Sequence, residues 1–182
     1  MKILVFSDIH GNAIACEKVL NQYVKQNCDF ILILGDILYH GPRNIITEGY
    51  NPKSVVEMLN PLSDKILACR GNCDAEVDQM LLNFPIMADY SLINDKNKTI
   101  FSSHGHIYSP YQINSKSTIV ENSKFPTFNK IDIFFYGHTH IQEYRRVNGI
   151  EICNPGSISL PKGNSSSGYA ICDDGNISLY KL

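Results

Sequence analysis

Side chains of the types that bind divalent metal ions follow five short apolar stretches of the sequence. These stretches cover residues 3–6, 30–34, 66–69, 100–103 and 131–136, and each has the composition of a buried strand. The polar side chains behind them are Asp8, His10, Asp36, Asn72, His104, His138 and His140. Open sheets place ligand sites at the carboxyl ends of their strands, so we expect these side chains to share one site at a sheet edge.

The donor types indicate which ions such a site would hold. They are two carboxylates, one amide and four histidines without a thiolate, a set that suits Mn²⁺, Fe or Zn²⁺ in a catalytic site. Of these ions we expect Mn²⁺. The seven donors are too many for one catalytic ion, but they suffice for two ions if one carboxylate bridges. Two divalent ions beside two carboxylates would leave positive charge that attracts a phosphate ester and stabilises its developing negative charge.

Two pairs of candidate ligands have the same spacing. Asp8 and His10 are two residues apart, as are His138 and His140. Residues i and i+2 of an extended strand point to the same side, so each pair could reach one ion if its strand continues past the first member. Considered one at a time, each of three of these residues could instead cap a turn at a strand end: Asp8, Asp36 and Asn72.

The composition is that of one soluble domain without a basic surface. The chain has 182 residues, 43% of them hydrophobic, and a formal net charge of −2, so it can bury a core but gives no strong nucleic-acid or membrane signal. The six cysteines are scattered, the sequence opens on a predicted strand rather than a signal peptide, and the apolar runs are too short for a membrane span. We expect a single cytoplasmic domain over residues 1–182.

The elements that position these side chains change in kind along the chain. The first half predicts strands over residues 2–7, 29–34 and 65–69 and helices over 11–26 and 52–62. The second half predicts three hairpins, with turns at residues 94–98, 148–149 and 173–175. Continuous apolar strands are typical of sheets covered on both faces. The pattern therefore favours two sheets packed face to face, with helices outside.

Six sequence blocks resemble, in order, those of the calcineurin-like metallophosphoesterases. They are SDIHGN at residues 7–12, LGD at 34–36, RGNCD at 70–74, HGH at 104–106, GHTH at 137–140 and NPGS at 154–157. One block alone is weak evidence, whereas the ordered set is specific and argues against simple turn caps. HGPRN at 40–44 and CDAEVDQMLL at 73–82 narrow the resemblance to bacterial phosphodiesterases of the family.

The resemblance implies an α/β fold, a four-layer α-β-β-α sandwich of two mixed β-sheets flanked by helices. It implies that one ion is held by Asp8, His10, Asp36 and His140, and the second by Asp36, Asn72, His104 and His138, with Asp36 as the bridge. A hydroxide that bridges the two ions would attack the phosphorus of a small phosphodiester substrate. Relatives form dimers or tetramers, so a homo-oligomer is a further expectation.

Two further residues are candidates for roles in the reaction. Many family members have histidine where this chain has Cys73, and a thiolate formed beside metal cations would be a poor acid. We therefore expect a preference for aryl esters and activated diesters. Arg43 could bind substrate phosphate through its forked guanidinium. A loop salt bridge for Arg43 and simple packing for Cys73 are the alternatives.

Two other functions compete with the phosphodiesterase. A phosphomonoesterase of the same fold would use the same ligands, and only the resemblance favours the diesterase. A non-catalytic interaction module is the other alternative, because the retromer scaffold subunit of eukaryotes resembles the same small fold. The complete ligand set argues against that module.

Overall fold

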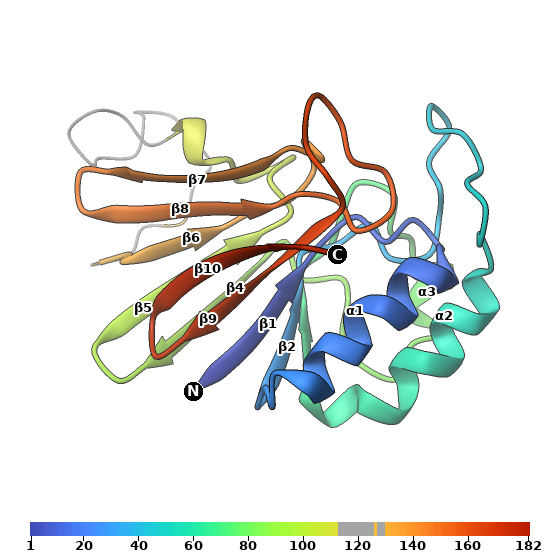
Figure 1. The fold of residues 1–182 in the computed structure, drawn as a ribbon, viewed down its shortest axis with the longest axis horizontal. Coiled ribbons are helices and arrows are strands. Elements are labelled where there is room, and N and C mark those ends of the chain that lie inside the picture. The colour runs from blue at the N-terminus through green and yellow to red at the C-terminus, as the bar shows by residue number, and fades with distance from the viewer. Residues whose placement is uncertain (113–125, 127–129) are drawn as a thin grey trace.

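The chain forms two five-stranded β-sheets with helices packed against one of them. The computed structural model describes residues 1–112, 126 and 130–182 (Figure 1). The strand order is β10-β9-β1-β2-β3 in the first sheet and β4-β5-β6-β8-β7 in the second. Each sheet holds three neighbouring parallel strands together with antiparallel strands. The prediction of two mixed sheets flanked by helices is confirmed.

The element boundaries lie close to those expected from the sequence. The first sheet contains β1 (Lys2–Phe6), β2 (Phe30–Ile33), β3 (Ile66–Ala68), β9 (Gly168–Asp173) and β10 (Asn176–Lys181). The second contains β4 (Tyr90–Asp95), β5 (Lys98–Ser103), β6 (Ile133–Phe135), β7 (Gln142–Val147) and β8 (Ile150–Pro155). The helices are α1 (Ala13–Lys25), α2 (Pro52–Leu59) and α3 (Glu76–Gln79), with 3₁₀ helices η1 (Asn60–Lys65) and η2 (Pro110–Gln112). All three expected hairpins form, as β4–β5, β7–β8 and β9–β10.

Helix α2 is shorter than the sequence pattern predicts. The α-helix ends at Leu59 rather than at residue 62, and the chain continues as the 3₁₀ helix η1. Pro61 explains the change, because it has no N–H to donate to the carbonyl four residues earlier, although Asn60 before it keeps an α conformation. Within the described ranges, none of the helices has the length and apolar character that crossing a membrane requires.

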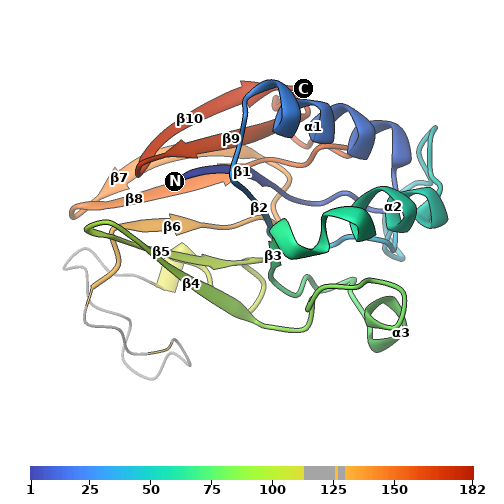
Figure 2. The same cartoon turned by 90° about the horizontal axis from the view of Figure 1, so that it is seen from below.

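Alternation along the central strands divides their side chains between two cores. Leu4 of β1 and Ile31 of β2 pack beneath α1 and α2 on the outer face of the first sheet. Val5 and Leu32 face the second sheet. All four side chains are fully buried, and each such burial contributes about 1.5–3 kcal/mol. Figures 1 and 2 show both helices on the same face of this sheet.

The loops that follow the parallel strands meet at one edge where the two sheets adjoin. The loops after β1 and β2 are joined by the Asp8 N–H, which donates to the Gly35 carbonyl at 3.1 Å. The loops after β5 and β6 are joined by the Gly137 N–H, which donates to the His104 carbonyl at 2.9 Å. His104 Nδ1 lies 2.7 Å from the Leu34 carbonyl and links the two sets. The fold therefore brings chain segments from both sheets to one site.

Candidate metal centre

The pairs Asp8–His10 and His138–His140 converge through turns and not through continuous strands. The condition that each strand continues past the first member of its pair is not met, because β1 and β6 both end before these residues. Asp8 and His10 have φ values of 56° and 47°, and His138 and His140 have values of 67° and 61°. Asp36 has a φ of 56° as well. Residues other than glycine seldom adopt this left-handed conformation, which here turns each side chain toward the centre.

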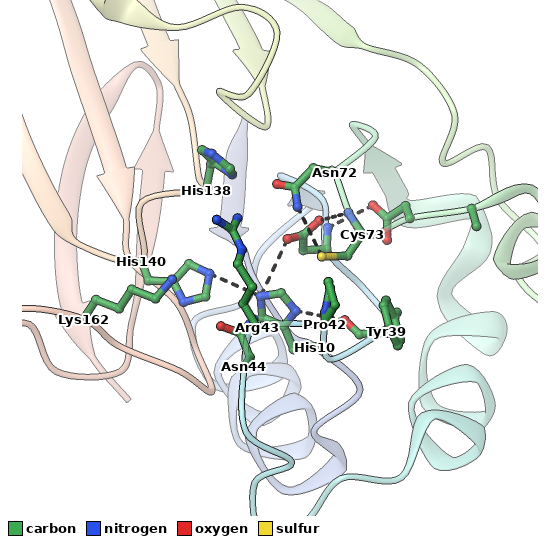
Figure 3. A pocket seen from close by; sticks show the side chains of 14 residues that line it. His10, Tyr39, Pro42, Arg43, Asn44, Asn72, Cys73, His138, His140 and Lys162 are labelled. Atoms are coloured by element: carbon green, nitrogen blue, oxygen red, sulfur yellow. Dashed lines mark hydrogen bonds and ion pairs between the residues drawn. The ribbon is translucent and has the colours of Figure 1, made fainter.

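One group of donors surrounds the Asp8 carboxylate. His140 Nε2 lies 3.2 Å from Asp8 Oδ1 and 3.2 Å from His10 Nε2. His10 Nε2 lies 3.8 Å from Asp8 Oδ1 and 3.6 Å from Asp36 Oδ2. Figure 3 shows His10 and His140 directed toward one another across the cavity. These are the four residues that the family resemblance assigns to one ion.

A second group of donors lies on the other side of Asp36. His104 Nε2 lies 3.4 Å from Asp36 Oδ2 and 3.1 Å from Asn72 Oδ1. The His138 ring centroid is 5.2 Å from that of His104, and the His138 N–H donates to Asp8 Oδ2 at 3.2 Å. Asp36 Oδ2 thus lies within reach of both groups, as a bridging carboxylate requires.

The buried histidines all present the same ring nitrogen to the centre. Their Nδ1 atoms lie against backbone carbonyls: His10 on Tyr39 at 2.9 Å, His104 on Leu34 at 2.7 Å and His140 on Leu160 at 2.6 Å. A carbonyl only accepts, so each Nδ1 carries the hydrogen when the ring is neutral. The Nε2 lone pairs then point into the centre, which is the arrangement that orients histidine as a metal ligand.

The electrostatics of the centre favour bound cations. Asp8 Oδ1 is buried and has no hydrogen-bond partner in the described part of the chain, and an unpartnered carboxylate oxygen is costly to bury. Burial raises the pKa of Asp36, but the hydrogen bond and charge of His104 outweigh it and hold that pKa well below its usual range. Ligand atoms of Asp8, Asp36 and His104 lie within 4.8 Å of one another, as do those of Asp8, His10 and His140. The donor set fits divalent ions.

A cavity of about 700 Å³ lies above this centre, and both Cys73 and Arg43 line it. The Cys73 N–H donates to Asp36 Oδ1 at 2.8 Å, and the thiol is half-buried. Burial, followed by the Asp36 carboxylate, raises the pKa of the thiol to about 12, the direction opposite to that expected beside cations. In the described part of the chain Arg43 forms no ion pair, so the loop salt bridge is not seen.

Sequence analysis missed two residues that belong to this region. Asp74 is buried, and its carboxylate accepts N–H groups from Asp36 at 2.9 Å, Gly71 at 2.7 Å and Ile37 at 2.8 Å. It therefore ties together the loops that follow β2 and β3. The RGNCD block contains Asp74, but the residue was not singled out. Lys162 lines the same cavity from the loop after β8, and its polar, glycine-rich surroundings gave no functional signal.

Asp74 and the glycines keep these two loops in close contact. A Cβ atom on Gly71 would overlap the backbone and carboxylate of Asp36, and one on Gly35 would lie 2.5 Å from the Gly71 nitrogen. Burial raises the pKa of Asp74 to about 6, although three backbone N–H groups donate to it. Glycine at both positions is thus required for the approach that brings Asp36 beside Asn72.

Comparisons with known proteins agree with this geometry. Phosphodiesterase YfcE of Escherichia coli K12 is 42% identical over 165 residues, which cover 91% of this chain and 83% of YfcE. The E. coli YfcE structure matches with a TM-score of 0.89 and 40% identity, covering 100% of this chain and 93% of that one. Phosphodiesterase MJ0936 of Methanocaldococcus jannaschii is 24% identical over 162 residues, covering 86% of this chain and 83% of that protein.

A more distant structure shares the fold alone. A single mutant of Vps29 from Entamoeba histolytica matches with a TM-score of 0.62 at 18% identity, covering 100% of this chain and 98% of that chain. Residues 1–175 match the sequence profile of the calcineurin-like phosphoesterase superfamily domain. With a profile that spans nearly the whole chain and relatives that share its sequence and fold, the protein belongs to the calcineurin-like phosphoesterase superfamily.

Proposed function

We propose that the protein is a phosphodiesterase that uses two divalent metal ions to hydrolyse small phosphodiesters. The observation that carries the proposal is the set of histidine Nε2 atoms around two shared, buried carboxylates, one of which has an unpartnered oxygen. The 42% identity to a protein named as a phosphodiesterase supports the same reaction class. A non-catalytic role would leave this costly arrangement without a purpose.

The ligand assignment follows the two groups of donors. One ion would be held by Asp8, His10, Asp36 and His140, and the other by Asp36, Asn72, His104 and His138. We propose Mn²⁺, with Zn²⁺ or Fe as the alternatives that the same donors accept. When bound, the ions supply a hydroxide nucleophile and positive charge for the phosphoryl oxygens.

The chain's own residues would orient the ester within the cavity. Figure 3 shows the Arg43 side chain reaching into the space between His138 and His10. From there its guanidinium can donate two hydrogen bonds to the non-bridging oxygens of the phosphate. Cys73 lines the cavity beside Asn72 and is a weaker proton donor than the histidine that many relatives carry. Aryl and activated diesters, whose leaving groups need little protonation, are therefore the proposed substrates.

The location of the protein is a separate proposal. All six cysteines are free, and five of them are buried. Unpaired cysteines suit a reducing compartment, so we place the protein in the cytoplasm.

Chelation and metal addition test the proposed reaction. Treatment with EDTA should abolish hydrolysis of bis(4-nitrophenyl) phosphate, and Mn²⁺ should restore more of the rate than Mg²⁺, because the site offers four histidines. Full activity in metal-free protein would end the proposal. Faster turnover of 4-nitrophenyl phosphate than of the diester would indicate a monoesterase. Metal binding without turnover of either ester would favour an interaction module.

A further inference from the structure

Lys162 is held at the rim of the catalytic cavity by its own loop. Its N–H donates to the His140 carbonyl at 3.0 Å, and its carbonyl accepts the Ser165 N–H at 3.2 Å. Ser165 Oγ in turn accepts the Gln142 N–H at 2.8 Å. These bonds attach the loop after β8 to the segment that carries His140. These bonds fix the backbone of Lys162 relative to the candidate metal ligands, while its side chain is exposed and lines the cavity.

The cavity carries more positive charge than a simple phosphodiester would neutralise. Lys162 and Arg43 both line it, and within the described ranges neither forms an ion pair with a carboxylate. Two divalent ions would add four positive charges and the two basic side chains two more, while Asp8, Asp36, Asp74 and the metal-bound hydroxide would remove four. The formal balance of +2 exceeds the single negative charge of the reacting diester. An anion on the substrate that reaches both the metal centre and Lys162 would be attracted by this excess positive charge.

The two sides of the cavity differ in chemistry. Figure 3 places Lys162 beside His140 on one side, with Tyr39 and Cys73 on the other. The Tyr39 side has the Asp74 carboxylate next to Cys73 and an aromatic ring that is 42% exposed. The Lys162 side offers an ammonium group. A diester bound across the centre would therefore place its two ester arms in unlike surroundings.

We propose that Lys162 binds an anionic group on one ester arm, so that the site prefers phosphodiesters whose second arm carries a further phosphate or carboxylate. The inference rests on the proposed function, in which Arg43 contacts the phosphate that reacts. An uncharged aryl arm lies toward Tyr39 and Cys73, and the anionic arm lies toward Lys162. A lysine ammonium acts as a point charge, so either a phosphate or a carboxylate on the second arm can pair with it.

The proposal is tested with three 4-nitrophenyl phosphodiesters that share one leaving group. Their second arms are carboxymethyl, 2-hydroxyethyl and choline, which are anionic, neutral and cationic. We expect kcat/KM to fall in that order, with about a fivefold step between the first two, the size of an exposed ion pair. Lys162→Gln should equalise the first two substrates, and Lys162→Glu should reverse the order. Lys25→Gln, at an exposed lysine in the last turn of α1, should change nothing.

Equal kcat/KM for the three substrates in the wild type would overturn the proposal. So would a preference that survives Lys162→Gln, or one that Lys25→Gln removes equally well. If the Mn²⁺-loaded wild type hydrolyses none of the esters, the proposed function fails, and calorimetry still tests Lys162. Phosphoglycolate should then bind Lys162→Gln about fivefold more weakly than wild type, while ethyl phosphate binds both alike. An equal change for the two ligands would reject the role of Lys162.

Discussion

Replacing Asp74 by asparagine should weaken the contacts that hold the loops of the candidate metal centre together. The Asp74 carboxylate accepts backbone N–H groups from Asp36 and Gly71 on one oxygen and from Ile37 on the other. An asparagine oxygen can keep the first two bonds, but its amide NH₂ then faces the Ile37 N–H. One buried donor without an acceptor costs about 1–3 kcal/mol. We expect Asp74→Asn to lower the free energy of unfolding by about 2 kcal/mol.

The same change should weaken metal binding, because Asp74 positions the backbone of Asp36. Loss of a group that orients a ligand typically costs about 10–100-fold in metal affinity. Urea unfolding in EDTA and a Mn²⁺ titration of activity measure the two effects. Asp78→Asn is the matched control. Asp78 is also buried, but among the described residues its carboxylate accepts a single N–H, that of Ala75 at 2.9 Å, a bond that asparagine can keep. If the two variants have the same stability and the same Mn²⁺ midpoint, the reasoning about Asp74 is refuted.

Three further variants probe the bridge, the leaving group and the surface charges. Asp36→Asn should leave the fold intact, because asparagine still accepts the Cys73 N–H. It should remove metal and activity together, because the bridging residue loses its charge; two bound metals at a normal rate would contradict the bridge. Cys73→His should supply a general acid and make log rate depend less steeply on leaving-group pKa; an unchanged slope with metals bound would make Cys73 a packing residue. Asp174 pairs with Lys96 and with the amino terminus, which lower its pKa to about 2. Its stabilising effect is therefore present above pH 3.8 and lost as pH falls through about 2, so the stability difference from Asp174→Asn should shrink over that range in acid unfolding; a constant difference would reject the pairing.

The sheets could be read from the sequence because their burial is local and periodic. Residues 3–6 of β1 and all of β2 are apolar, since both faces of the sheet are covered: Leu4 faces the helices and Val5 faces the other sheet. The hairpin turns carry residues that tolerate positive φ, such as Asn148 and Gly149 with values of 50° and 88°. The exact ends of α2 and the hairpin strands depend on single residues and pairing partners, so the pattern located them only approximately.

The parts of the site that the sequence did not reveal depend on contacts between distant segments. Asp74 and Asp36 are 38 residues apart, and no local periodicity relates a carboxylate to backbone N–H groups in another loop. Lys162 lies in a polar stretch of the kind that usually forms a solvated loop, and its bond to the distant His140 helps to place it at the cavity. Residue type alone could not distinguish these two from other acidic and basic residues.

The left-handed backbone at the ligands shows how the centre is held. Among the described residues, nine other than glycine have positive φ, and five of them are candidate ligands. Such conformations cost about 1–3 kcal/mol each and persist only where the surroundings impose them. Here the His10 N–H donates to the Asp36 carbonyl at 2.9 Å, and the His138 N–H donates to Asp8 Oδ2 at 3.2 Å. These ligand loops are therefore tied to one another by hydrogen bonds, so contacts within the protein itself orient the donors.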